Sequence, residues 1–465
     1  MKAAVLLLTA ATLAACQPAP FVRPDVPVPA AWPHQEGATG DAAATPVSLA
    51  EQSWTEIYPV PELTALIDEA LVGSSDLRIA FERVELARAQ YGLERAASLP
   101  AVDLAGAAAR ERMPGVLPTD NQIRESWVFA LAMPAWEIDL WGRLAARTEA
   151  ARRDVLANAA LAEGVRTSLV AQVSSLYLEL LDLDNQLETT RRTLEGRRQA
   201  LRMTRARFEE GISSILDTRQ AESLLASSEQ SLADQQRQLA QAQNALAVLI
   251  GRNPGSISRS VRLESLPLPA SVMAGLPSEL LDRRPDILAA EEALRGAGAN
   301  IEAARKAFLP RLTLTTLLGF ASPELSQLFD SGRLAWSLQP GVGVPLFDGG
   351  RLRSGVELAE SQQRILVEQY KATIRQAFRE VSDALVAFER LSQQREAARR
   401  VAIANRERLR LSQVRYLAGI SSYFEVLDAE RQLFESEMAL SQTIRANHQA
   451  VVQLYRALGG GWVKA

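Results

Sequence analysis

The sequence predicts a mainly α-helical fold with a small β part, built from two copies of one structural repeat. Three observations carry this prediction: short motifs recur at a fixed offset, two long stretches contain no proline, and each is preceded by segments of alternating apolar residues. Gly211 and Gly419 set the offset, since 419 minus 211 is 208. Chance similarity between Ala- and Leu-rich helices would explain single matches, but not several in one register.

The predicted segments follow this repeat in order. The first repeat, 61–253, is expected to contain a helix from Pro61 to Ser98, a β-hairpin at about 101–138 and a long helical hairpin with its tip at 211–217. A linker, 254–276, follows it. The second repeat, 277–465, is expected to contain a helix, a β-hairpin at about 311–347 and a long helical hairpin with its tip at 419–428.

The composition argues against several function classes. The chain has 465 residues, 51 basic and 55 acidic, with a net charge of −4, which gives no reason to expect a nucleic-acid partner. Its two histidines, His34 and His448, are far apart in the sequence, and no nucleophile or metal-ligand cluster stands out. We therefore expect no enzyme activity, no catalytic or metal-binding residues and no cofactor.

The N-terminus has the pattern of a bacterial lipoprotein signal. Lys2 gives a basic start, and an apolar run too short to span a membrane leads to a small-residue cleavage site before Cys16, the only cysteine. We expect residues 1–15 to be the signal peptide and Cys16 to be acylated. Residues 16–60, which are rich in Pro and Ala, are expected to form an extended, lipid-anchored tether. The alternative is an ordinary signal peptide with a chance cysteine.

The predicted strands carry large apolar residues on one face and small or polar residues on the other. In the last strand, expected to run to Leu346, Leu334, Trp336 and Leu338 alternate with residues such as Ser337. This pattern suits a transmembrane barrel, and a half-buried sheet on a soluble core is the alternative. Four strands cannot close alone, because the smallest bacterial barrels have about eight and lipid does not tolerate an open edge. We expect a barrel shared between subunits.

The proline-free stretches Trp141–Asn253 and Leu346–Ala465 are expected to form long coiled helices. Heptad spacing of apolar residues marks the packing seam of the first copy at Val173, Leu180, Leu187, Leu194, Leu201 and Phe208. The second copy substitutes Asn447 at such a position. It also places Arg395 and Ala402 at heptad positions of its rising helix, which indicates a looser seam or a local break there. At each tip, Gly is expected to stop one helix and the side chain of a following Ser to cap the next.

The chain is similar to the TolC-type outer-membrane efflux channels, and specifically to the NodT-like lipoprotein branch that serves resistance-nodulation-division pumps. The similarity covers essentially all of the mature chain. It rests on Cys16, Leu280–Asp286 (LLDRRPD), Phe308–Pro310 before the strands, Pro345–Gly350 after them and the tip Gly419–Arg431. It implies a homotrimer in which four strands per subunit make a twelve-stranded transmembrane β-barrel and the long helices form a periplasmic α-barrel.

The resemblance also implies functional residues at the second tip. The matching positions of a periplasmic gate are Phe424 as an apolar ring, Glu425 and Asp428 as acidic rings, Arg431 and the tip tyrosine Tyr416. Asp428 and Arg431 are three residues apart on one helix and can pair. An ordinary capped, solvated helix start is the alternative reading of these charged residues.

The expected function is that of a passive, gated outer-membrane duct in a tripartite efflux system. The expected partners are outer-membrane lipid, an inner-membrane transporter and a periplasmic adaptor that grips the tips at Gly211, Ser213, Gly419 and Ser421. Two alternatives remain open: a lipid-anchored coiled-coil scaffold without a pore, and the exit duct of a type I secretion system. The alternating strands favour a channel, because a scaffold does not need them.

Overall fold

The computed structural model describes residues 21–32, 49, 52–113, 122–269, 272 and 274–460. The chain folds into two compact units. The strand unit contains Glu82–Ala159 and Ala289–Lys371, with described residues up to Asp25, and the tip unit contains Val26–Phe81, Ala160–Leu288 and Ala372–Ala465. Each unit therefore draws residues from both predicted repeats.

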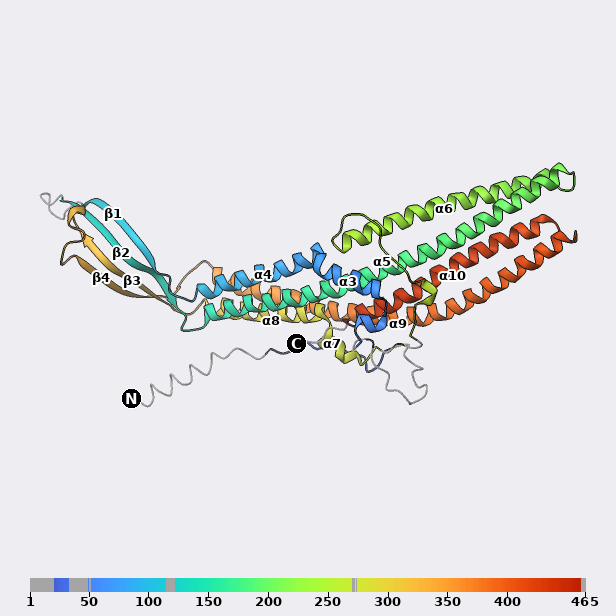
Figure 1. The fold of residues 1–465 in the computed structure, drawn as a ribbon. Helices are drawn as coiled ribbons and strands as arrows, with labels where there is room; N and C mark the ends of the chain where they lie inside the picture. Colours follow the sequence, from blue (N-terminus) through green and yellow to red (C-terminus); the bar gives the residue numbers. More distant parts are fainter. Residues whose placement is uncertain are drawn as a thin grey trace. The chain divides into compact units, whose positions relative to one another are not determined.

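The strand unit contains a four-stranded antiparallel sheet in the order β1-β2-β3-β4 (Figure 1). Its strands are β1 (Asp103–Met113), β2 (Gln122–Ile138), β3 (Arg311–Ser322) and β4 (Leu334–Gly343). The fourth strand ends before the predicted Leu346, and Leu346 is in irregular structure ahead of a turn at Gly349 and Gly350, which both have positive φ. Because the order is sequential, β1 and β4 form the two edges of the sheet.

One face of this sheet presents large apolar side chains in rows that cross all four strands. Leu104, Leu131, Leu318 and Trp336 are consecutive cross-strand partners, with exposed fractions of 64%, 50%, 54% and 74%. The neighbouring row, which faces the opposite side because side chains alternate along a strand, is Ala105, Ala130, Gly319 and Ala335. The predicted two-faced pattern is therefore present across all four strands.

The helices before the hairpins differ between the two halves. The predicted helix from Pro61 to Ser98 is interrupted, giving α3 (Pro61–Gly73) and α4 (Ser75–Ala96). The break lies where Gly73 touches the end of α6 (Ile215–Leu249): a Cβ on Gly73 would lie 2.3 Å from the Ile250 oxygen, so only glycine fits. In the second half, η3 (Pro277–Glu279) and α7 (Leu280–Arg283) precede α8 (Pro285–Lys306).

The long helices match the duplication. Helices α5 (Arg143–Glu209) and α9 (Arg351–Leu417) each have 67 residues, and α6 and α10 (Tyr423–Ala457) each have 35. The predicted seam positions from Val173 to Leu201 are buried, whereas Phe208 is exposed. No break occurs at Arg395 or Ala402, since α9 is continuous through both positions and Ala402 is buried. The buried amide of Asn447 in α10 donates to the Phe388 oxygen at 3.3 Å and to Ser392 Oγ at 3.2 Å.

The predicted tether and linker contain more fixed structure than expected. Trp32 is buried in the tip unit, where its Nε1 donates to the Gly275 oxygen at 3.0 Å, and a short helix, α2 (Trp54–Ile57), follows. The linker contains a 3₁₀ turn, η2 (Leu263–Ser265), with Leu263 buried. Apolar side chains thus fix parts of both segments. Cys16 and His34 lie outside the described residues.

The LLDRRPD segment has a clear structural role in the tip unit. The guanidinium of Arg284 is almost fully buried and contacts Asp286 at 2.6 Å and Glu380 at 3.0 Å, and it donates to the Ala457 oxygen at 2.9 Å. Arg284 therefore joins the start of α8 to α9 and to the end of α10. Across the described residues, none of the helices is both long and apolar enough to cross a membrane.

Candidate functional site at the helical tips

Both tips are short turns that glycine makes possible. Gly211 and Gly419 have φ angles of 73° and 72°, a left-handed conformation that side chains disfavour. The next amide in each turn bonds back to the helix, from Ile212 to the Arg207 oxygen at 2.8 Å and from Ile420 to the Arg415 oxygen at 2.9 Å. These bonds satisfy the last carbonyls of α5 and α9. The two turns thus end their helices in the same way.

The serines of the two turns behave differently. Ser214 caps α6, since its side chain accepts from the Leu216 amide at 3.0 Å while Asp217 accepts from the Ser214 amide. Ser422 starts α10 without a side-chain cap bond, so the expected serine cap is wrong for the second tip. Ser213 Oγ donates to the Thr204 oxygen at 3.4 Å, and Ser421 Oγ is buried with no partner among the described residues.

Asp428 lies at the centre of a charged cluster on α10. Its carboxylate contacts Arg431 at 3.0 Å, as predicted, and also Arg408 of α9 at 2.7 Å. Hydrogen bonds from Arg431 and, to a smaller extent, Arg408 hold the pKa of Asp428 below its ordinary value. Gln432 donates to the same carboxylate at 3.1 Å. Sequence reasoning missed Arg408, because it is 20 positions earlier on another helix and no local pattern connects the two.

Phe424 and Glu425 lie in the first turn of α10, on its accessible side. The Phe424 ring is exposed, and Glu425 lies 3.5 Å from Arg415 at the end of α9. Phe424 and Glu425 are therefore exposed to solvent, and Asp428, one turn further along α10, is half-buried by its ion pairs.

Tyr416 is placed differently from the other predicted gate residues. Its ring is buried 5.1 Å from the Tyr423 ring, with the Arg207 guanidinium over it at 5.0 Å. Leu201 of α5 and Val426 of α10 belong to the same apolar cluster. Tyr416 thus packs the two helical hairpins against each other and does not face an opening in the single chain.

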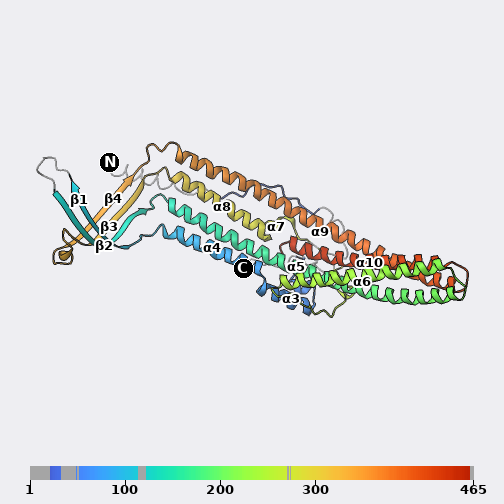
Figure 2. The same cartoon turned by 90° about the horizontal axis from the view of Figure 1, so that it is seen from above.

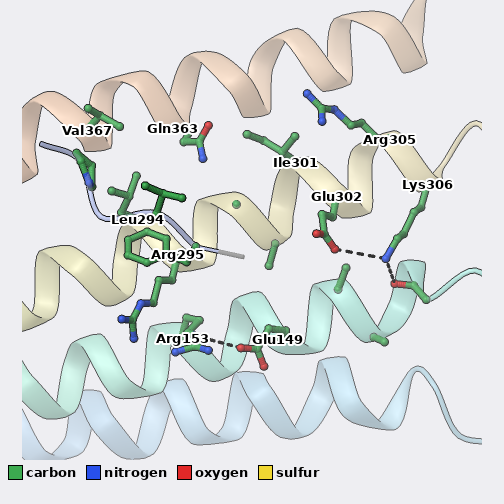
Figure 3. Close-up of a pocket in the computed structure, with 18 residues that line it drawn as sticks. Glu149, Arg153, Leu294, Arg295, Ile301, Glu302, Arg305, Lys306, Gln363 and Val367 are labelled. Carbon is green, nitrogen blue, oxygen red and sulfur yellow. Dashed lines mark hydrogen bonds and ion pairs between the residues drawn. The ribbon is translucent and has the colours of Figure 1, made fainter. Parts of the chain in front are cut away.

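A cavity of about 870 Å³ in the strand unit lies between α5, α8 and α9 (Figure 3). The charged side chains drawn at its edge are paired: Arg153 with Glu149 at 2.6 Å, and Lys306 with Glu302 at 3.4 Å. Across the part of the chain that the structure describes, no group of His, Cys, Asp and Glu is arranged to hold a metal ion. The cavity therefore has the character of a groove between helices.

Comparison with known proteins gives a consistent result. The profile of the family described as "outer membrane efflux protein" matches residues 66–252 and 276–460. The outer membrane protein OprJ of Pseudomonas aeruginosa is 39% identical over 471 residues, covering 98% of this chain and 95% of that protein. The solvent efflux pump outer membrane protein SrpC of Pseudomonas putida is 37% identical, covering 95% and 94%.

Solved structures show the same similarity. A membrane protein from Pseudomonas aeruginosa superposes with a TM-score of 0.88 at 36% identity, covering 95% of this chain and 99% of that one. The open state of the Neisseria gonorrhoeae MtrE outer membrane channel gives a TM-score of 0.85 at 30% identity, covering 96% and 98%. The predicted fold class and the resemblance to efflux channels are confirmed.

Proposed function

Because the chain belongs to the outer membrane efflux protein family, we propose that it is the exit duct of a tripartite efflux system, which passes small molecules out through the outer membrane. The duct itself carries out no reaction and uses no cofactor. An inner-membrane transporter of the resistance-nodulation-division class supplies the energy, and a periplasmic adaptor joins the two.

The observation that carries this proposal is the apolar face of the four-stranded sheet. Its rows of exposed side chains, such as Leu131, Leu318 and Trp336, cross all four strands, and both edge strands are free to pair. In lipid, an apolar outer face is favourable and an unpaired edge is not. Three copies joined edge to edge would give a closed twelve-stranded barrel with this face outward.

The gate belongs to this proposal. Phe424, Glu425 and Asp428 would narrow the periplasmic end when three copies meet, with Arg408 and Arg431 neutralising Asp428 in each copy. Tyr416 would act indirectly, by holding the two hairpins together. The adaptor would contact the turns at Gly211, Ser213, Gly419 and Ser421, and acylated Cys16 would anchor the protein in the outer membrane.

Single-channel recording of the full-length protein in a planar bilayer tests the duct. Discrete conductance steps are expected, and a lipid-anchored scaffold would give none. The double variant Asp428→Ala, Arg431→Ala should conduct more. Each exposed ion pair is worth about 0.2–1 kcal/mol, so losing the two Asp428 pairs shifts the open-to-closed ratio by up to about 30-fold per subunit.

A matched control exists on the first tip. Arg219 and Glu222 form an exposed pair of the same spacing on α6, 2.8 Å apart. Alanine at both positions should leave the conductance unchanged. Equal effects of the two double variants, or no effect of either, would remove the gate assignment while leaving the duct itself intact.

A further inference from the structure

Strands β1 and β2 extend beyond the rest of the sheet. The pairing of β2 with β3 ends at Trp127, which lies between Ala108 of β1 and Ser322 of β3. Among the described residues, only β1 and β2 continue past this row, as a two-stranded ribbon that reaches Met113 and Gln122. Figure 2 shows this end of the sheet on the side away from α4 and α8. In the proposed duct, whose helices lie in the periplasm, the ribbon points to the outside of the cell.

The apolar face of the sheet has the height of a membrane. Its row nearest the helices is Ile138, Leu312 and Val342, and the row at Trp127 and Ser322 lies ten residues (322 minus 312) further along β3. Ten residues of strand span about 33 Å, which is about 25 Å along the membrane normal at a strand tilt of about 40°. Outer-membrane barrels present an apolar band of about this height to lipid. The row at Trp127 therefore marks the outer boundary of the hydrocarbon layer.

Aromatic rings gather at the same level and support this boundary. Phe329, in the loop after β3, packs against Phe129 and Phe320, with ring centroids 5.8 Å and 5.5 Å apart. Phe129 lies two positions from Trp127 and therefore on the same face of the sheet. The Phe329 ring remains largely exposed. Girdles of aromatic side chains are typical of the two boundaries between a membrane barrel and water.

Two arginines follow on the same face, just past this boundary. Arg110 and Arg112 lie two and four positions beyond Ala108 on β1, so both point to the side of the apolar rows. Arg112 is exposed, and the Arg110 side chain is 70% exposed. Arg110 contacts its cross-strand partner Glu125 at 3.1 Å, an exposed pair that binds weakly and can be replaced by another anion. The outer face thus changes from apolar to basic within two residues.

The heights of the two arginines indicate the kind of headgroup. At about 3.3 Å per residue and the same tilt, Arg110 lies about 5 Å and Arg112 about 10 Å beyond the boundary. The headgroup layer of an ordinary phospholipid is about 5–8 Å thick. Its phosphates would reach Arg110 alone, whereas a larger sugar headgroup that carries phosphate groups would reach both. Guanidinium groups suit such a ligand, because each can donate two parallel hydrogen bonds to one phosphate.

We propose that Arg110 and Arg112 bind the phosphorylated sugar headgroup of a glycolipid in the outer leaflet, while the apolar rows below them contact its acyl chains. This inference rests on the proposed function, which places the ribbon on the outer side of the membrane. It adds a lipid-binding surface to each subunit. Glu125 is the one acidic side chain on this face of the ribbon among the described residues, so the face keeps a net positive charge.

Native mass spectrometry of the full-length protein in detergent, titrated with diphosphoryl lipid A, tests the surface. Each arginine near a membrane surface contributes about fivefold to the affinity for anionic lipid, so Arg110→Gln, Arg112→Gln should weaken binding about 25-fold. Lipid A without its phosphates should bind the parent protein as weakly as diphosphoryl lipid A binds the double variant. Phosphatidylglycerol, an ordinary anionic phospholipid, should bind the parent more weakly than diphosphoryl lipid A.

The ribbon offers a matched control. Arg124 faces Glu111 across the ribbon as Arg110 faces Glu125, but on the opposite side of the sheet. Arg110→Gln alone should weaken lipid A binding about fivefold, and Arg124→Gln should leave it unchanged. All three arginines are exposed, so the variants should fold, and their melting curves should match that of the parent protein.

The outcomes separate this inference from the proposed function. Unchanged lipid A binding in the double variant, or an equal loss in Arg110→Gln and Arg124→Gln, would overturn the arginine surface. Phosphatidylglycerol bound as tightly as lipid A would overturn the assignment to a glycolipid. In each case discrete conductance steps of the same preparation in a planar bilayer would leave the duct standing. A parent protein without conductance would overturn the duct itself, and with it the basis for placing the ribbon outside.

Discussion

The buried His448 predicts a specific loss of stability at mildly acidic pH. His448 lies on α10 in the tip unit, where the Tyr58 hydroxyl is 3.3 Å from Nδ1 and donates to the His448 backbone oxygen at 3.1 Å. Burial, with a smaller contribution from the positive charge of Arg395, lowers the pKa of His448 from 6.5 to about 4. Other charged residues line the same cavity as His448 and Arg395: Glu264, Glu396, Arg399 and Arg406.

The sign follows from proton uptake. Between about pH 6.5 and pH 4 the unfolded chain binds a proton at His448 and the folded chain does not, so the free energy of unfolding falls as the pH falls. Integrating over this range gives a loss of about 2 kcal/mol per subunit at pH 5, relative to neutral pH. Well above pH 6.5 the folded and unfolded states are both neutral at this residue, and no loss is expected.

Thermal unfolding of the purified protein in detergent, followed by far-ultraviolet circular dichroism at pH 7.5 and pH 5, measures this loss. His448→Phe removes the titrating group and should flatten the pH dependence. His34→Gln, which removes the only other histidine, is the control and should behave as the parent protein. If His448→Phe lost as much stability on acidification as the parent, the reasoning from burial would be refuted.

Three other substitutions give independent tests. Gly251→Ala should destabilise the protein by about 1–3 kcal/mol, because Gly251 has a φ of 83° and a Cβ there would lie 2.4 Å from the Gly73 oxygen. Gly255→Ala is the control: a Cβ there would have no neighbour closer than 3.8 Å, so this variant should be neutral in the same melting assay. Arg284→Ala should cost about 3 kcal/mol because it leaves buried partners unpaired, measured by the same melting curves. Cys16→Ser should abolish acylation, seen as a lower mass of the mature protein, while trimers still form.

Local signals in the sequence predicted the elements well. Glycine with a following serine located both tips, since the left-handed turn at Gly211 and Gly419 is a property of a few adjacent residues. The absence of proline predicted the long helices. Alternation predicted the strands, because side chains that alternate along a strand face opposite sides of a sheet whatever the partner strand is.

Contacts between distant positions could not be predicted in this way. Asp182 is buried in α5, where Arg445 of α10 lies 3.0 Å away, and nothing near either residue in the sequence indicates the pairing. The same holds for Arg408 beside Asp428, and for Tyr416, whose burial depends on the approach of the other helical hairpin. The missing cap at Ser422 shows that equal motifs do not ensure equal hydrogen bonds.

The row Ala105, Ala130, Gly319 and Ala335 has a consequence for what the barrel could transmit. Gly319 lies so near Ala130 that a Cβ would be 2.3 Å from the Ala130 Cα, so a bulky side chain could not be inserted there without moving a strand. If this face borders the bore, the position of Gly319 is protected against single substitutions that would narrow it. Changes in the range of exported molecules would then have to arise at other positions of the conduit.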